Sequence, residues 1–467
     1  MKNSIALLSA LLLAPLASLA AAEPPKPNIV MILIDDMGYG DVEPFGCKQC
    51  KTPALNRMAD EGMKLTSFYS APICSASRAQ IQTGCYAQRV SITGALMPGS
   101  KIGLNPQEHT VAKLLKQQGY QTMCVGKWHL GDQPEFFPMN YGFDHYFGLP
   151  YSNDMLRSKA GTSEKVVPLM RDNQVVELLK DEEENKLNRI YTEEAVKFIQ
   201  EHQNGPFYLY LAHNAVHVPI HPGPEFAGHS GHGRYYDWVE ESDWSVGRVM
   251  DTLRELHLEQ NTLVFFTSDN GPWLKHGKDA GSAAPLRGGK FTTWEGGLRE
   301  STFAWWPGHI PAGRVCDAVT GEIDLLPTFV SLAGGTVPTD RPIDGANMSD
   351  LLLGKSEVSP REAHFYYVQH SFQAVRSGPW KLAIRQQEGV KEKGLRLYNL
   401  DKDIGETTNV ASENPEVVNR LKALADKQEA SLNAGIRAPG TVQNAKPLYP
   451  MENKKPGKKD KMQENNP

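Results

Sequence analysis

Continuous apolar runs alternate with amphipathic stretches over the first two thirds of the chain. The clearest run, Asn28-Ile-Val-Met-Ile-Leu-Ile34, ends abruptly in Asp35-Asp36, as expected of a strand that is covered on both faces. Further strands are predicted at 122–125, 207–211 and 262–267, and helical periodicity predicts helices at 107–118, 190–201 and 240–257. Strands that alternate with helices predict an α/β layered fold with a largely parallel sheet.

The pattern changes beyond about residue 355. A predicted helix at 415–433 follows short strand-like runs at 363–368, 373–376, 380–384 and 396–399, which indicates a small antiparallel α+β subdomain. From Pro439 onward the chain is rich in Lys, Asn and Pro, and a solvated, disordered tail is favoured over a contact site for an anionic glycan. We therefore expect an α/β domain at 26–355, the α+β subdomain at 356–436 and the tail at 437–467.

The N-terminus is typical of a secretory signal peptide. Lys2 supplies a positive charge, residues 5–19 are apolar, and Ala20-Ala21-Ala22 offers a cleavage site. The alternative is a membrane anchor, but Pro15 and the short Ala-rich run argue against one. We expect a signal peptide at 1–22, an exported protein that is periplasmic or secreted, and no stable membrane insertion.

Composition narrows the possible partners. The 467 residues carry a formal net charge of −5 and no basic stripe with interleaved aromatic residues, so no nucleic-acid partner is expected. Six cysteines are too few for a disulfide framework in a chain of this length. The pair in Cys47-Lys-Gln-Cys50 could be half of a zinc site, but without a second close Cys/His pair a local disulfide or two free thiols is favoured.

Two oxygen-rich clusters, Asp35-Asp36 and Asp269-Asn270, each follow a predicted strand. The carboxyl ends of parallel strands lie at one edge of a sheet, where three carboxylates and an amide would repel one another without a cation. A ligand set made of oxygen alone favours Ca²⁺ or Mg²⁺ over zinc. Each pair alone could simply cap a turn or a helix. The two pairs together favour the metal site.

Cationic and titratable side chains also follow predicted strands or lie in a glycine-rich loop. In Gly126-Lys-Trp-His129, Lys127 and His129 would point to the same side if the preceding strand continued, which suits an anionic ligand. His217 lies just past another predicted strand, and Lys290 follows two glycines that would either let the backbone approach a ligand closely or simply form a turn.

The segment Pro72-Ile-Cys74-Ser-Ala-Ser-Arg78, followed by Thr83-Gly84, resembles the Cys-x-Pro/Ala-x-Arg signature of the type I sulfatases, the family of the arylsulfatases and N-acetylgalactosamine-6-sulfatase. Ala76 stands where Pro is more familiar, and Cys85 is unusual for its position. The resemblance extends over residues 26 to 430, in the family's order, through Asp35-Asp36, Lys127 to His129, Ser152, His217, Asp269-Asn270, Lys290, Trp294 to Arg299 and Leu397 to Asp401.

This resemblance implies an alkaline-phosphatase-like fold: a layered α/β/α catalytic domain with a large mixed, mostly parallel sheet, and a small C-terminal antiparallel α+β subdomain. It also implies a sulfatase that hydrolyses a sulfate ester, on a sulfated carbohydrate or small molecule, to an alcohol and inorganic sulfate. The implied cofactors are Ca²⁺, or Mg²⁺, and formylglycine (3-oxoalanine) made from Cys74. A formylglycine-generating or radical maturation enzyme is then a required partner.

The same resemblance assigns roles to individual residues. The metal ligands would be Asp35, Asp36, Asp269, Asn270 and the modified Cys74. Arg78 would hold the hydrated residue 74, while Lys127 and Lys290 neutralise the sulfuryl oxygens. His217, or its rival Lys290, would protonate the departing alcohol, His129 would remove the proton that triggers sulfate release, and Ser152 would donate a hydrogen bond near the sulfate or His129.

Substrate choice is expected to lie in loops around this centre. The candidate segments are Asn153-Asp154-Met155, His213, His221 and Trp273 to His276, with Asp154 and His276 the candidates for hydroxyl contacts. Two other functions stay open. One is a phosphodiesterase or phosphonate hydrolase of the same superfamily, and the other is an inactive glycan-binding homologue whose Cys74 is never oxidised.

Overall fold

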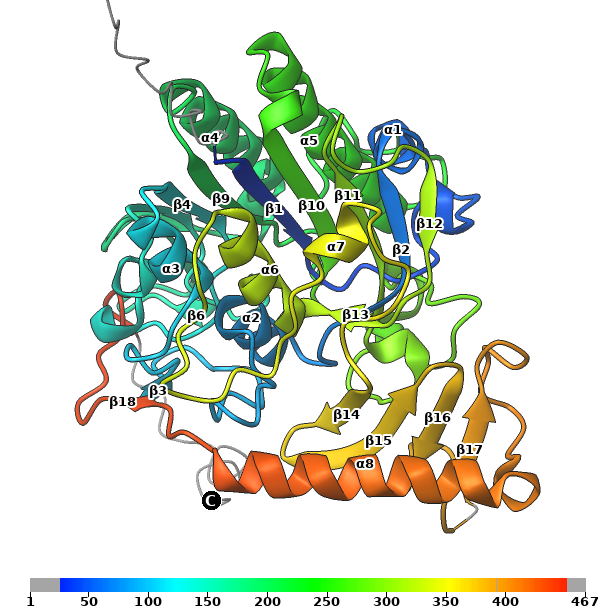
Figure 1. The fold of residues 1–467 in the computed structure, drawn as a ribbon. Helices are drawn as coiled ribbons and strands as arrows, with labels where there is room; N and C mark the ends of the chain where they lie inside the picture. The colour runs from blue at the N-terminus through cyan, green and yellow to red at the C-terminus, as the bar shows by residue number, and fades with distance from the viewer. Residues whose placement is uncertain (1–25, 392, 452–467) are drawn as a thin grey trace, which may run out of the picture.

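The computed structural model describes residues 26–391 and 393–451. Within them, a twelve-stranded sheet carries helices on both faces. The C-terminal part of the chain forms a four-stranded sheet with one long helix, which lies beside this larger unit (Figure 1). The expected signal peptide at 1–22 and residues 452–467 of the expected tail lie outside the described residues.

The centre of the large sheet is parallel. The strand β1 pairs in parallel with β10 on one side and β9 on the other, and β4 and β5 continue in the same direction. Every residue of β1, β9 and β10 is buried, as their continuous apolar runs predict. These strands are β1 (Asn28–Ile34), β4 (Gln121–Gly126), β5 (His145–Gly148), β9 (Phe207–Ala212) and β10 (Thr262–Ser268).

Antiparallel strands flank this centre and make the sheet mixed. On one side β11 runs antiparallel to β10, β2 runs antiparallel to β11, and β12 and β13 pair in parallel with β2. On the other side β7 runs antiparallel to β5, and both β6 and β8 pair antiparallel with β7. Their bounds are β2 (Met63–Tyr69), β6 (Arg157–Ser158), β7 (Lys165–Arg171), β8 (Gln174–Leu179), β11 (Arg299–Trp305), β12 (Arg314–Cys316) and β13 (Thr320–Gly321).

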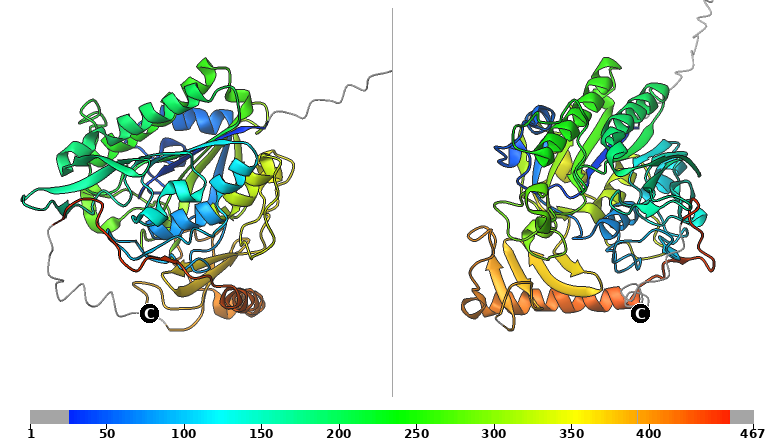
Figure 2. Two further views of the ribbon diagram at one scale, coloured as in Figure 1. Left: turned by 90° about the vertical axis from the view of Figure 1, so that its left-hand side faces the viewer. Right: turned by 180° about the vertical axis from the view of Figure 1, so that it is seen from behind.

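Helices cover both faces of the sheet (Figure 2), and a hydrophobic core lies on each face. Because side chains alternate along a strand, Ile29, Met31 and Leu33 of β1 enter one core and Val30, Ile32 and Ile34 enter the other. The first core packs against α2 (Cys74–Thr83), α3 (Val111–Gln117), α6 (Leu325–Leu332) and the short α7 (Ser349–Leu352). The second packs against α1 (Pro53–Glu61), α4 (Leu187–Glu201) and α5 (Arg234–Glu255).

The C-terminal sheet is antiparallel throughout, in the order β14, β15, β16, β17. Helix α8 lies across it, and Leu421, Ala425 and Leu432 of α8 share a core with Val375 and Leu382 of the sheet (Figure 1). The predicted antiparallel α+β character of this region is confirmed. The bounds are β14 (His364–Val368), β15 (Ser371–Ser377), β16 (Trp380–Ala383), β17 (Arg396–Asn399) and α8 (Pro415–Ala434).

The beginning of the expected tail departs from the prediction of disorder at 437–467. Strand β18 (Gly440–Thr441) pairs antiparallel with β3 (Ile102–Gly103), and the Tyr449 hydroxyl donates to the carbonyl of Val166 at 2.9 Å. The Tyr449 ring is buried. A composition averaged over the whole tail conceals this anchoring aromatic residue, so the prediction was wrong for residues up to 451.

Among the described helices, none combines the length and the apolar composition that a membrane-crossing helix requires.

Candidate active site

Parallel pairing brings the strand ends of the large sheet to one edge. Ile34 of β1 lies opposite Ser268 of β10, so Asp35 and Asp269 follow side by side, and the Asp269 amide donates to the Ile34 carbonyl at 2.9 Å. Asp36 adopts a left-handed backbone conformation with φ of 62°, which aspartate tolerates better than most residues. The chain can therefore turn sharply while both carboxylates stay at the edge.

The four predicted metal ligands converge and are buried. The Asn270 amide nitrogen donates to Asp36 Oδ1 at 2.6 Å, and the Asp36 backbone amide lies 3.3 Å from Asp269 Oδ1. Three oxygens of the group, Asp35 Oδ1, Asp36 Oδ2 and Asn270 Oδ1, are buried and have no hydrogen-bond partner. Unpartnered buried oxygens are unfavourable, and a hard divalent cation is the ligand that would satisfy them together. The residues present therefore fit such an ion.

Two lysines face the acidic group. Lys127 Nζ contacts Asp35 Oδ2 and donates to Ser152 Oγ at 3.1 Å, and Lys290 Nζ lies 2.6 Å from Asp36 Oδ1. Burial alone would raise the pKa of Asp35, but Lys127, His217, Arg78 and Lys290 hold it well below its usual range. Asp35 is therefore ionised, and the cations that keep it so are available to an anionic ligand.

Arg78 organises the acidic side of the site. Its Nε and Nη2 donate to Asp269 Oδ2 at 3.1 and 2.9 Å, Nη2 lies 3.5 Å from Asp35 Oδ2, and Nη1 donates to the Lys127 carbonyl. One rigid guanidinium thus ties two carboxylates to the end of β4. Burial and the neighbouring Asp35 raise the pKa of Asp269, although Arg78 opposes them.

Cys74 is the first residue of α2, at the end of the helix that carries a partial positive charge. The side chain is buried, within electrostatic range of Lys127, Lys290, Asp35 and Asp269. Burial raises the pKa of its thiol, and the two lysines do not reverse the effect. The unmodified thiol is therefore protonated at neutral pH, which makes it a poor nucleophile.

His129 reaches the site by a route that differs from the prediction. Strand β4 ends at Gly126 (φ of 102°), where an added Cβ would lie 1.9 Å from the Ala212 carbonyl oxygen, so the strand does not continue through Lys127 and His129. A turn with φ of 57° at His129 follows instead. Burial, Lys127 and Arg78 lower the pKa of the imidazole, which is therefore neutral.

Hydrogen bonds fix the orientation of both histidines. His129 Nε2 lies 3.0 Å from the Leu96 carbonyl and Nδ1 has no partner, so the assigned tautomer leaves Nδ1 free to accept a proton. His217 Nδ1 lies 2.6 Å from the Val218 carbonyl, which turns Nε2 toward Asp36 Oδ2 at 3.6 Å. Burial and Lys290 lower the pKa of His217.

A cavity of about 380 Å³ adjoins the acidic, lysine and histidine side chains described above, which we call the catalytic group. Trp273 is the shared wall: its ring lies 5.7 Å from the His217 ring and 4.5 Å from the His276 ring, and Lys290 Nζ lies 5.0 Å from its centroid. Asp154 and His276, chosen from separate loops, both line this cavity, while His213 is buried elsewhere with Nε2 2.9 Å from Ser245 Oγ. The complete lining is Asp154, Val218, Pro219, Ile220, Arg234, Trp273, His276 and Asp279.

Arg234 and Asp279 were missed by the sequence analysis, because neither follows a predicted strand or belongs to a motif. Their side chains lie 3.6 Å apart, and they bring one cation and one carboxylate to the cavity. The presence of Arg234 beside Asp154 in the lining depends on how α5 begins, which the sequence analysis placed at 240 and the structure places at Arg234.

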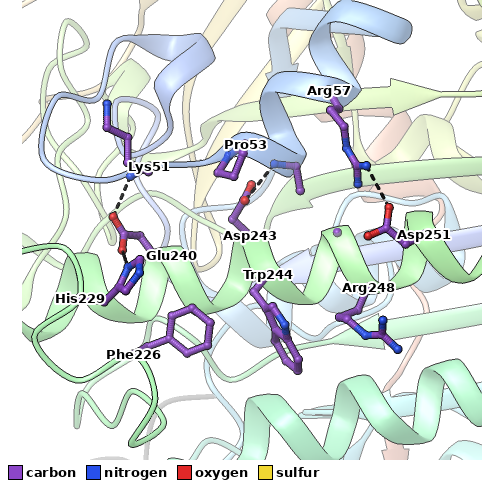
Figure 3. Close-up of a pocket in the computed structure, with 12 residues that line it drawn as sticks. Lys51, Pro53, Arg57, Phe226, His229, Glu240, Asp243, Trp244, Arg248 and Asp251 are labelled. Atoms are coloured by element: carbon purple, nitrogen blue, oxygen red, sulfur yellow. Dashed lines mark hydrogen bonds and ion pairs between the residues drawn. The ribbon is translucent and has the colours of Figure 1, made fainter.

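A second cavity, of about 480 Å³, is lined by residues of α1 and α5 and of the segment with Phe226 and His229, and by none of the predicted site residues (Figure 3). Its acidic side chains are already paired. Glu240 contacts His229 and accepts from the Lys51 amide at 2.8 Å, Asp243 accepts from the Ala54 amide at 2.9 Å, and Asp251 accepts from Arg57 at 2.9 Å. We assign this cavity no chemical role.

Cys47 and Cys50 are buried with their sulfur atoms 2.9 Å apart. Among the described residues, neither cysteine belongs to a group of three potential metal ligands, so nothing supports half of a zinc site.

Comparison with known proteins gives a consistent result over nearly the whole chain. Residues 27–335 match the family model described as sulfatase, and residues 290–431 match that of the N-sulphoglucosamine sulphohydrolase C-terminal region. N-acetylgalactosamine-6-sulfatase of Mus musculus is 42% identical over 390 residues, covering 79% of this chain and 74% of that protein. Human (Homo sapiens) arylsulfatase A is 37% identical over 473 residues, covering 91% and 92%.

Among solved structures, the PsFucS1 sulfatase from Pseudoalteromonas sp. has a TM-score of 0.81 to this chain at 26% identity. The match covers 89% of this chain and 92% of that one. The predicted alkaline-phosphatase-like fold is confirmed.

Proposed function

We propose that this chain, which belongs to the sulfatase family, hydrolyses the sulfate ester of a carbohydrate to an alcohol and inorganic sulfate. One observation carries the proposal: Cys74, at the start of α2, faces a buried group of acidic ligands flanked by Lys127 and Lys290. A site with this charge pattern binds a tetrahedral anion against a cation.

For the metal, we assign Asp35, Asp36, Asp269 and Asn270 as ligands, with the modified residue 74 as a further one. The three unpartnered oxygens in this set favour Ca²⁺, with Mg²⁺ as the alternative. When bound, such an ion acts as a Lewis acid toward a hydroxyl and a sulfate oxygen.

For the nucleophile, we assign Cys74 in its oxidised form, formylglycine, made by a separate maturation enzyme. If present at this position, formylglycine would offer the two hydroxyls of its hydrate, one suited to attack on sulfur and one to the later release of sulfate. The place of Cys74 at the start of α2, within electrostatic range of Lys127, Lys290 and the acidic group, supports this assignment.

The surrounding side chains have distinct tasks. Lys127, held by Ser152, and Lys290 neutralise the sulfuryl oxygens, and Arg78 keeps Asp269 and Asp35 in place. His129 accepts a proton at its free Nδ1. The protonated form of His217 or of Lys290 would donate a proton to the departing alcohol, because both side chains lie against Trp273, which lines the cavity that would hold it.

The substrate is assigned to the cavity behind Trp273. An indole face suits the apolar face of a sugar ring, and Asp154 and His276 can bond its hydroxyl groups. The name of the mouse relative, N-acetylgalactosamine-6-sulfatase, supports a sulfated amino sugar or a similar hexose. We also propose export to the periplasm or medium, on the basis of Lys2 and the apolar residues 5–19.

The test compares the wild type with Cys74→Ala and the control Cys316→Ala, each co-expressed with a maturation enzyme. Turnover of an aryl sulfate and of a panel of sulfated mono- and disaccharides should fall more than about 1,000-fold in Cys74→Ala and hold in the control. Mass spectrometry of the peptide containing residue 74 should show an aldehyde in active wild type.

Full activity in Cys74→Ala, or an unmodified cysteine in active protein, would contradict the proposed chemistry. Preference for a phosphate diester over every sulfate ester would instead support the phosphodiesterase alternative.

A further inference from the structure

A second group of potential metal ligands lies behind the loop that carries Ser152 and Asp154. Asp181 and Glu184 belong to the 3-10 helix η4 (Asp181–Lys186), and His221 lies in the segment between β9 and α5. Each of the three offers one ligand atom, and these atoms lie within 4.8 Å of one another. None of the three has a place in the proposed sulfatase chemistry.

Glu184 is the buried member of the group. Its side chain is 0% exposed, Oε2 accepts from Asn153 Nδ2 at 3.1 Å, and Oε1 has no partner. Asn153 is also 0% exposed, and its Oδ1 has no partner either. Burial raises the pKa of Glu184 to about 9. A carboxyl group in this position needs either a proton or a cation, and Glu184 Oε1 and Asn153 Oδ1 are both buried without a hydrogen-bond partner.

Asp181 and His221, the other two members, are more exposed to solvent than Glu184 and Asn153. His221 Nε2 lies 3.1 Å from Asp181 Oδ1 but makes no hydrogen bond. The Asp181 side chain is 52% exposed and that of His221 15%, so an ion could reach the group from the Asp181 side. An imidazole nitrogen and a carboxylate oxygen at this distance can be two ligands of one ion.

We propose that Asp181, Glu184 and His221 bind one divalent transition-metal ion, with Zn²⁺ as the favoured ion. Two carboxylates with an imidazole suit Zn²⁺ or Mn²⁺ better than Ca²⁺. The ion replaces the proton of Glu184. A flip of the Asn153 amide, whose oxygen and nitrogen are assigned by hydrogen bonding alone, would bring Oδ1 beside Glu184 Oε2 and offer the ion a fourth ligand.

Such an ion would hold the loop around Asn153 in position. Asn153 stands between Ser152, which holds Lys127, and Asp154, which lines the cavity behind Trp273. An ion bound to Glu184 and Asn153 fixes that loop from behind without contacting the substrate. The proposal concerns metal binding and stands whether or not the assigned substrate is correct.

The test is a Zn²⁺ titration of the chelator-treated full-length chain in saturating Ca²⁺, by calorimetry, with metal content measured after gel filtration. The wild type should bind one Zn²⁺ per chain. Glu184→Gln and His221→Ala should each weaken binding at least about 10-fold. Glu182→Gln, an exposed neighbour in η4, should bind as the wild type does.

Glu184→Gln resembles the protonated acid in shape and charge, so it should fold, and its melting temperature without Zn²⁺ should match that of the wild type. Wild type that binds no Zn²⁺ in saturating Ca²⁺ would overturn the proposal and leave Glu184 a protonated acid. Zn²⁺ that is retained in Glu184→Gln but lost in Asp269→Ala would also overturn it, because the ion would then lie among the catalytic ligands.

Discussion

Trp273 lines the cavity and also lies next to His217 and Lys290 of the catalytic group. Its ring lies 5.7 Å from the His217 ring and 4.5 Å from the His276 ring, in an edge-to-face arrangement with His276, and Lys290 Nζ lies 5.0 Å from its centroid. Asp154 and Arg234 complete the far wall of the cavity. A sulfate held by Lys127 and Lys290 would therefore place its sugar ring against the indole.

The variant Trp273→Ala tests this placement. Loss of the indole surface should lower kcat/KM for a sulfated sugar about 10- to 100-fold, equivalent to about 1.5 to 3 kcal/mol. A small aryl sulfate, which leaves most of the cavity empty, should lose much less. Trp273→Phe keeps a flat apolar surface and serves as the control. Equal losses for both substrates would show that Trp273 acts through His217 and Lys290 and not on the sugar.

At the scale of secondary structure, the sequence predicts those elements whose buried side chains are apolar. Strands β1, β9 and β10 are continuous apolar runs, and the acidic residues after β1 and β10 meet because parallel strand ends share one edge. For this reason the sequence alone is sufficient to group the four proposed metal ligands.

Helix α2 could not be predicted from hydrophobic periodicity, although it carries Cys74. Every residue from Cys74 to Thr83 is buried, and many of them are polar side chains that face the site or its supports. Ser77, for example, donates to Glu322, and Arg78 binds Asp269. A helix with polar residues all round gives no amphipathic pattern. Strand β11 was missed for the same reason, since Glu300, Ser301 and Thr302 are fully buried.

Glu241 shows how α5 supports the segment that borders the cavity. It is buried, and Oε2 accepts from the Gly223 amide at 2.7 Å. Burial raises the pKa of Glu241 from 4.5 to about 7. The folded protein then keeps this proton at pH values where the unfolded chain has lost it. This group therefore stabilises the fold at acidic pH, and that contribution is lost as the pH rises from about 4.5 to about 7.

Glu241→Gln should remove this dependence, because glutamine is neutral at every pH and can still accept from Gly223. At about pH 8.5 the variant should exceed the wild type by about 1 to 3 kcal/mol in free energy of unfolding, and at about pH 5 the two should be similar. Urea titrations at both pH values measure this difference. Glu255→Gln, exposed on the same helix, should show no such change, and a pH-independent difference for Glu241→Gln would contradict the prediction.

At the scale of the whole molecule, a buried ionic group joins the large sheet to the C-terminal sheet. Lys381 of β16 lies 2.9 Å from Glu295 Oε1 and 2.7 Å from Glu406 Oε1, and its side chain is completely buried. Tyr69 of β2 and Tyr366 of β14 both donate to Glu295, at 2.6 and 2.8 Å. Although burial opposes it, Lys381 is the main cause that holds the pKa of Glu295 well below its usual range.

Lys381→Met should separate the stabilities of the two sheets. Methionine fills similar space but leaves Glu295 and Glu406 buried without their shared cation, which should cost about 3 to 5 kcal/mol. The cost should fall on the junction, so amide hydrogen exchange should accelerate in β14 to β17 and remain slow in β1, β9 and β10. Lys402→Met, exposed in the same subdomain, should change stability by less than about 0.5 kcal/mol.

If exchange accelerated equally in both sheets, the two would unfold as one unit that this ionic group does not hold together. If neither changed, the remaining hydrogen bonds to Glu295 would be sufficient to hold the junction.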